Sequence, residues 1–135
     1  MGTRSRIGII NSDGTVDNIY CHLDGYLGHN GRILVDYYTT EDKIRQLIAL
    51  GDISSLGQDI GTAHDFDHPP RGVCNAYGRD RGEQNVGYEH SADVAAFNAL
   101  NEEYNYLWLH GRWMVSSYTT DDKWMLVEEA KALFD

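Results

Sequence analysis

Cysteine, proline and long apolar runs are scarce in this sequence, and each scarcity narrows what the protein can be. The 135 residues include 2 cysteines and 2 prolines. Cys21 and Cys74 stand too far apart for the CxxC pairs of zinc and redox motifs, and two isolated thiols indicate a reducing, cytoplasmic setting. Since no apolar stretch is long enough for a membrane span or a signal peptide, we expect no contact with membranes.

Positive charge is also scarce. The chain has 11 Lys and Arg against 21 Asp and Glu, which gives a formal net charge of −10. Because phosphate contacts need a cationic surface, this balance argues against direct, non-specific binding of nucleic acid. An acidic surface either mimics nucleic acid toward a basic partner protein or simply keeps the protein soluble. The acidic residues of the last third include Glu102, Glu103, Asp121, Asp122, Glu128, Glu129 and Asp135.

The length indicates one domain over residues 1–135, because two domains of half this size would each need cross-links such as disulfides or bound metals to be stable. Its first elements are expected to form a hairpin. Ser5–Ile10 and Val16–His22 read as strands, and Asp13-Gly14 between them is a turn signal. The second strand would deliver polar side chains to a glycine-rich loop.

A helix is predicted after that loop, over Thr40–Ala49. Thr39 is the expected N-cap, with Asp42 reaching back to the backbone of the cap, and Gly51 is the expected left-handed residue at the C-terminal end. Residues 31–38 are ambiguous, because their apolar run is too short for periodicity to distinguish a helix from a strand.

The centre of the chain is polar. Residues 52–57 read as a turn or a single helical turn, and 58–89 as irregular but ordered chain interrupted by one strand near Val73–Tyr77. Three elements follow: a helix over Ser91–Asn101 capped by Ser91, a hairpin of Tyr104–Leu109 and Arg112–Ser117 turned by His110-Gly111, and a helix over Thr120–Phe134.

Together these elements predict an α+β fold. We expect a single domain whose mostly antiparallel sheet, built from two hairpins, packs with about three helices. The C-terminal aromatic residues are expected in the core: Tyr104, Tyr106, Trp108, Trp113, Tyr118 and Trp124.

Two segments of the chain resemble each other. Residues 26–43 and 106–123 are identical at 10 of 18 aligned positions and share the ending Y-T-T-x-D-K. One interpretation is a duplication that makes the domain pseudo-symmetric. The other is two uses of one local device, a turn that leads into a capped helix.

A first candidate binding segment runs from Ile19 to Lys43. Tyrosine rings offer flat area for stacking a base, glycines allow close backbone approach, and arginine can take a phosphate. The alternative is a structured loop whose His and Asp side chains bond to each other. The candidate ligand-binding residues here are Tyr20, His22, Asp24, Tyr26, His29 and Arg32.

A second candidate segment is unusually basic for this chain. Arg71, Tyr77, Arg79 and Arg81 could form a positive rim for an anionic ligand. The alternative is that these cations form salt bridges with the acidic residues nearest to them in sequence, which are Asp65, Asp67, Asp80 and Glu83.

Two catalytic interpretations carry less weight. His64-Asp65-Phe66-Asp67-His68 has the residue types of a metal site, but Pro69 and Pro70 disfavour the helix that would put both histidines on one face, and a third ligand would have to come from His22, Asp24 or His90. A nucleophilic Cys21 or Cys74 is also disfavoured, because small cysteines in strands are usually buried.

Several motifs resemble a family of small proteins encoded by tailed bacteriophages, prophages and some bacteria. They are S-R-I-G-I at Ser5–Ile9, D-G-x-x-x-x-I-Y-C-H-x-D-G-Y at Asp13–Tyr26, Y-x-T-x-x-K at Tyr38–Lys43, L-I-A-L-G-D-I-S-S-L-G at Leu47–Gly57 and A-Y-G-R-D-R-G at Ala76–Gly82. The similarity covers nearly the whole chain. Members often carry Trp where this chain has Leu23.

The resemblance implies a setting in the cytoplasm of a bacterial host, where small acidic phage proteins often act in counter-defence. The leading expectation is a non-catalytic, cofactor-free, homo-oligomeric sponge for a nucleotide-derived immune signal of the cyclic nucleotide or ADP-ribose type. One alternative is an acidic protein–protein inhibitor of a host defence nuclease such as a CRISPR complex. The third is a metal-dependent phosphodiesterase that uses His64, Asp65, Asp67 and His68.

Overall fold

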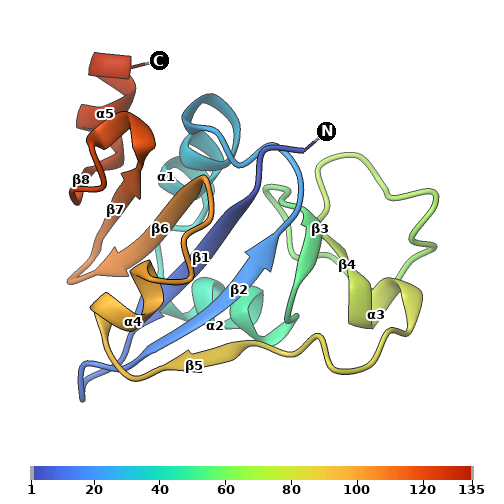
Figure 1. The fold of residues 1–135 in the computed structure, drawn as a ribbon. Helices are drawn as coiled ribbons and strands as arrows, with labels where there is room; N and C mark the ends of the chain where they lie inside the picture. Colours follow the sequence, from blue (N-terminus) through green and yellow to red (C-terminus); the bar gives the residue numbers. More distant parts are fainter. Residues whose placement is uncertain (1, 135) are drawn as a thin grey trace.

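A mixed sheet of eight strands organises the fold of residues 2–134, which the computed structural model describes, with side chains as far as Leu133. Its strand order is β4-β3-β2-β1-β6-β7-β8, and β5 pairs with part of β2 (Figure 1). The elements are β1 (Ser5–Ile10), β2 (Val16–Cys21), the π-helix η1 (Leu27–Gly31), α1 (Arg32–Tyr37), α2 (Glu41–Ala49), β3 (Ile53–Ser55), β4 (Asn75–Ala76), α3 (Tyr77–Arg81), β5 (Glu89–Ser91), α4 (Val94–Asn98), β6 (Tyr104–Leu109), β7 (Arg112–Ser117), the 3-10 helix η2 (Tyr118–Thr120), β8 (Met125–Leu126) and α5 (Val127–Phe134).

The α+β class and the mostly antiparallel sheet are confirmed. The hairpins β1–β2 and β6–β7 form as predicted, and β2–β5, β3–β4 and β7–β8 are antiparallel as well. The two hairpins meet through the parallel pair β1–β6, and β2 also pairs with β3 in parallel. Both parallel contacts join strands far apart in sequence, so local turn chemistry does not specify them.

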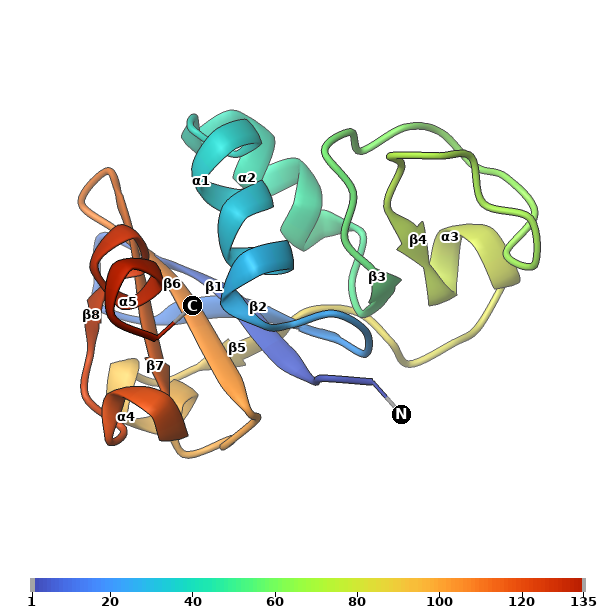
Figure 2. The same cartoon turned by 90° about the horizontal axis from the view of Figure 1, so that it is seen from above.

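The helices lie on both faces of the sheet (Figure 2). α1 and α2 cover one face and α4 covers part of the other. On the first face, Ile7, Ile9 and Ile19 join the main hydrophobic cluster, whereas Val16 and Leu107 pack with Phe97 of α4 on the second. The alternation follows from the two-residue period of the strands.

The aromatic residues of the C-terminal part take both core and surface positions. Tyr104, Tyr106 and Trp113 are buried as predicted. Trp108 and Trp124 are half-buried and pack against the two hydrophobic clusters. Tyr118 is 69% exposed, so its core assignment is wrong.

The start of α2 differs from the prediction by one residue. The side chain of Thr40, rather than Thr39, accepts the hydrogen bond from the backbone N–H of Lys43. Thr40 has extended backbone, which an N-cap requires, and the helix then begins at Glu41. Gly51 follows the helix with a φ of 76°, as predicted for a left-handed C-terminal residue.

Three element predictions are wrong because short strand pairings take their place. Residues 52–57 contain β3, which pairs with both β2 and β4. Ser91 lies in β5, and α4 begins later, with the Asp93 side chain accepting from the Ala96 N–H. The last helix begins only at Val127, because the left-handed Asp121 and Asp122 interrupt the chain before β8. Asp135 lies outside the described residues.

The internal similarity is not a structural duplication. Residues 27–37 form η1 and α1, whereas the aligned residues 107–117 form the β6–β7 hairpin. The second copy has His110 and Gly111 at positive φ (49° and 80°), the backbone of a two-residue hairpin turn. Segments that are identical at 10 of 18 positions therefore form two structures, and the residues that differ, together with the packing of each copy, decide between them.

Candidate functional site

A cleft of about 680 Å³ lies where η1 and α1 face the long segment between β3 and β4. It brings the two predicted binding segments together, because Asp24, His29 and Arg32 of the first segment share it with Arg71 of the second. The other lining residues are Ile33, Tyr37, Ser55, Leu56, Gly57, Gln58, Pro69, Pro70, Gly72 and Val73.

Two arginines give this cleft its positive charge. Arg32 is exposed, and its Nε donates a hydrogen bond to the Gly28 carbonyl at 3.3 Å. Arg71 is exposed too, and within residues 2–134 its side chain makes no hydrogen bond or ion pair. Asp24 is the carboxylate of the lining and offsets part of the charge. Two guanidinium groups with unused donors are suited to an anion that has several oxygen atoms.

The imidazole ring of His29 forms a hydrogen bond with the buried side-chain amide of Asn30. Its Nδ1 lies 2.8 Å from the Asn30 Oδ1, and Asn30 is fully buried. The Asn30 Nδ2 donates to the Ser5 Oγ at 3.2 Å and to the Cys21 Sγ at 3.4 Å. The ring orientation is thus fixed by groups that belong to the core.

The floor of the cleft depends on close backbone approach. A Cβ on Gly57 would lie 2.5 Å from the Gly72 carbonyl oxygen, so only glycine fits there. The Tyr38 hydroxyl donates to the Gly57 carbonyl at 2.7 Å. The Lys43 Nζ donates to the carbonyls of Tyr37 and Gln58, at 2.8 and 2.6 Å. These bonds connect α1 and α2 to the segment that carries Arg71.

Three residues of the first predicted set lie outside the cleft. The Tyr20 hydroxyl and the His22 Nδ1 are 2.8 Å apart and bond to each other, whereas the structured-loop alternative expected a bond between His and Asp. Tyr26 is 44% exposed but does not line the cleft. The aromatic residue that lines it is Tyr37, which the sequence analysis missed. Its signal is the four-residue spacing from Ile33, which is visible only once residues 31–38 are known to be helical.

Arg79 and Arg81 are held by ion pairs, as the alternative for the second segment predicts. The Arg79 Nε donates to Asp80 at 2.8 Å, and its terminal nitrogens donate to the carbonyls of Ile60 and Cys74, both at 2.8 Å. Arg81 pairs with Glu83.

Arg81 also covers an aromatic pair outside the cleft. Its guanidinium lies 4.4 Å from the ring centre of Phe66 and 5.0 Å from that of Tyr77. Arg81, Tyr77 and Arg79 therefore organise their own segment, and a direct ligand role for them stays a prediction without support from the cleft.

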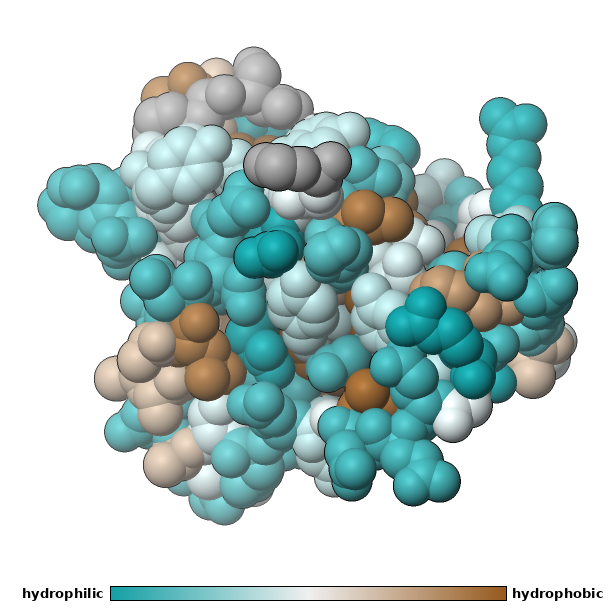
Figure 3. All heavy atoms as spheres, turned by 45° about the vertical axis from the view of Figure 1, so that its right-hand side comes forward, coloured by the Kyte–Doolittle hydropathy of each residue, from teal (hydrophilic) through white to brown (hydrophobic). Residues whose placement is uncertain are grey.

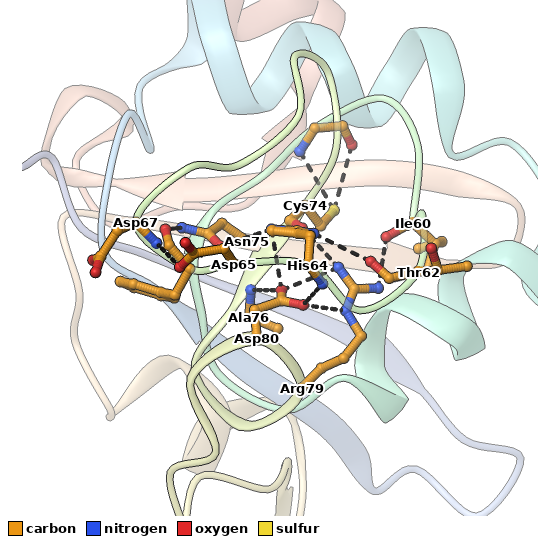
Figure 4. A network of polar contacts seen from close by, with 12 residues as sticks. Ile60, Thr62, His64, Asp65, Asp67, Cys74, Asn75, Ala76, Arg79 and Asp80 are labelled. Carbon is orange, nitrogen blue, oxygen red and sulfur yellow. Dashed lines mark hydrogen bonds and ion pairs between the residues drawn. The ribbon is translucent and has the colours of Figure 1, made fainter.

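Asp80 is the centre of a buried polar network (Figure 4). Its side chain is fully buried, and it accepts hydrogen bonds from the backbone N–H groups of Ala76 and His64 at 2.7 and 3.2 Å. Burial alone would raise the pKa of Asp80, but the hydrogen bonds from Arg79, Ala76 and His64 outweigh it and hold the pKa below its usual range. The network fixes the long segment against α3.

The His64–His68 segment takes part in this network and does not form a metal cluster. The His64 Nε2 lies 3.0 Å from the Asn75 Oδ1, while the exposed His68 bonds to Asp65 at 2.9 Å. That bond raises the pKa of His68 and lowers the pKa of Asp65. Within residues 2–134, no group of three His, Cys, Asp or Glu side chains is placed to hold a metal ion.

Both cysteines are fully buried free thiols. Burial raises the pKa of Cys21 to about 11, and burial also raises the pKa of Cys74. A thiol of this kind stays protonated at neutral pH, so the arrangement does not provide a nucleophile.

The surface beside the long segment is polar. Figure 3 shows a largely hydrophilic face on which hydrophobic residues form small, separate spots.

In the C-terminal part of the chain, the acidic residues Asp121, Asp122, Glu128 and Glu129 are all exposed. An acidic docking surface made of these residues stays a prediction.

Neither family models, nor curated proteins, nor solved structures gave a match to this chain. Within residues 2–134, every helix is too short or too polar to cross a membrane.

Proposed function

We propose that this protein binds a small nucleotide-derived anion, of the cyclic nucleotide or ADP-ribose type, in the cleft between α1 and the β3–β4 segment and sequesters it without turning it over. One observation carries the proposal. Arg32 and Arg71 present unused guanidinium donors in one cleft of a chain whose net charge is −10. In an otherwise acidic protein, such a local reversal of charge favours capture of an anion.

The rest of the cleft suits the remainder of a nucleotide. Its volume of about 680 Å³ falls within the usual range of small-molecule sites, roughly 300–1,000 Å³. Tyr37 supplies an aromatic ring, and Pro69 and Pro70 supply apolar surface beside the charged residues. A base packs well against such groups while arginines hold the phosphates.

The biological setting of the proposal rests on the resemblance to phage-encoded proteins. A small phage protein that removes a nucleotide signal would disable a host immune response in the bacterial cytoplasm. A sponge acts by stoichiometric capture, so it needs tight binding, and a homo-oligomer with clefts at subunit junctions would enclose the ligand further.

Calorimetry with ADP-ribose and with a cyclic dinucleotide tests the proposal. Arg32→Ala and Arg71→Ala should each weaken binding about 10- to 100-fold, because a hydrogen bond to a charged group contributes about 1.5–3 kcal/mol. Arg112→Ala is the matched control. Arg112 is an exposed arginine at the start of β7, outside the cleft, and its loss changes the net charge equally.

Absence of binding by every such nucleotide would refute the proposal. The acidic inhibitor would then be tested by reversing the charges of Asp121, Asp122, Glu128 and Glu129, which should abolish inhibition of its target. Conversion of a bound cyclic nucleotide into product would refute sequestration and favour the phosphodiesterase.

A further inference from the structure

His29 has one ring nitrogen committed and one free. Nδ1 lies 2.8 Å from the Asn30 Oδ1, while Nε2 makes no hydrogen bond within residues 2–134. Because His29 lines the cleft, Nε2 is the nitrogen that remains for a ligand. Whether Nε2 donates or accepts a hydrogen bond depends on which nitrogen carries the proton in the neutral ring.

The contacts of Asn30 decide that question. The Cys21 thiol donates to the Leu23 carbonyl, with the sulfur 3.4 Å from the oxygen, so the sulfur is an acceptor toward Asn30. The Asn30 amide nitrogen therefore faces Cys21 and Ser5, and its oxygen faces His29. An oxygen at that position requires a proton on Nδ1, which leaves the lone pair of the neutral imidazole on Nε2.

We propose that Asn30 is a positioning residue that holds His29 in the Nδ1–H tautomer, so that Nε2 accepts a hydrogen bond from a ribose hydroxyl of the ligand. This inference rests on the proposed function of the cleft and specifies its substrate class. The ligand is a ribose-bearing phosphate with a free hydroxyl, as in ADP-ribose, rather than inorganic pyrophosphate or a nucleotide whose ribose hydroxyls are blocked.

The other charges of the cleft agree with this selectivity. The Asp24 carboxylate lines the cleft and, like Nε2, can only accept. Arg32 and Arg71 can only donate. The cleft thus offers donors for an anion and acceptors for hydroxyl groups. A bare pyrophosphate would satisfy the arginines, but its oxygens would face two further acceptors without a proton to share.

The tautomer can be measured on the full chain without any ligand. Nitrogen-15 NMR at about pH 8.5, above the ordinary pKa of histidine, separates protonated from unprotonated ring nitrogens. We expect Nδ1 of His29 to be protonated and Nε2 unprotonated. In Asn30→Ala the His29 signals should shift toward a mixture of tautomers, a change that a merely structural role for Asn30 would not produce. A protonated Nε2 in the wild-type protein would overturn the inference.

The selectivity is tested by calorimetry with ADP-ribose and its analogue in which the terminal ribose hydroxyls are methylated. The wild-type protein should prefer ADP-ribose about 2- to 10-fold, since one hydrogen bond contributes about 0.5–1.5 kcal/mol. His29→Ala should discriminate less between the two compounds than the wild-type protein does. Equal affinity of the wild-type protein for the two compounds would refute the selectivity alone. If neither compound nor any cyclic dinucleotide binds, the proposed function is refuted. The tautomer of His29 would then still be decided by the NMR experiment.

Discussion

Replacing Asp80 by alanine should destabilise the protein strongly. Its carboxylate is fully buried and pairs with Arg79 through hydrogen bonds of 2.8 and 3.1 Å. It also accepts from the backbone N–H groups of Ala76 and His64. In the variant these two buried donors lose their acceptor, and Arg79 keeps only its bonds to two carbonyls.

The magnitude follows from what remains buried. Removing one partner of a buried ion pair costs about 3–5 kcal/mol. For a protein of this length, that loss lowers Tm by about 10 °C or more. Asp80→Asn should give little rescue. Both carboxylate oxygens accept from protein donors, so the amide nitrogen of asparagine would face a donor in either orientation.

Thermal and urea unfolding followed by circular dichroism give the assay. Glu83→Ala is the matched control. It breaks the exposed ion pair of Glu83 with Arg81 at the end of α3, and it should lower the free energy of unfolding by less than about 1 kcal/mol. A Tm of Asp80→Ala within 3 °C of wild type would refute the reasoning. The variant should also bind nucleotide more weakly, since the network orders the segment that carries Arg71.

The stability difference between the wild-type protein and Asp80→Asn should depend on pH in a definite direction. Because the pKa of Asp80 is lowered in the folded protein, its contribution to stability is complete above the ordinary aspartate pKa of about 3.9. The contribution is lost as the pH falls through the lower, folded-state pKa. The difference in unfolding free energy between wild type and Asp80→Asn should therefore be constant near neutrality and shrink below about pH 4.

Two further predictions concern the floor of the cleft and the thiols. Gly57→Ala should weaken nucleotide binding, measured by calorimetry, and lower stability, measured by urea unfolding. The added Cβ would lie only 2.5 Å from the Gly72 carbonyl oxygen and would force that carbonyl away. Gly87→Ala, whose Cβ would meet nothing within 4 Å, should leave both unchanged, and an equal effect of the two substitutions would contradict the argument. Cys21 and Cys74 should not react with a thiol reagent at neutral pH until the protein is unfolded, because both are fully buried; rapid labelling of the native protein would show that the core opens.

The candidate site could be predicted only in part. Asp24, His29, Arg32 and Arg71 were identified by residue type and line one cleft. For Arg79, residue type was not enough, because a cation near acidic residues can bind a ligand or an ion-pair partner, and only distances distinguish the two. Tyr37 was missed because its position depends on the helical state of α1, which a short apolar run does not reveal.

The sequence by itself determined the elements that depend on neighbouring residues. Asp13-Gly14 and His110-Gly111 specify tight turns, and both hairpins follow from the alternation around them. A capping threonine and Gly51 likewise bound α2, because capping is satisfied within a few residues.

Only the tertiary structure decided how these pieces meet. The parallel pairings of β1 with β6 and of β2 with β3, and the placement of Arg71 and Arg32 in one cleft, join segments far apart in the chain. Residues 26–43 and 106–123 illustrate the same limit, since segments identical at 10 of 18 positions form helices in one place and a hairpin in the other. The free energy of burial is summed over the whole core, and at such positions it outweighs local preference.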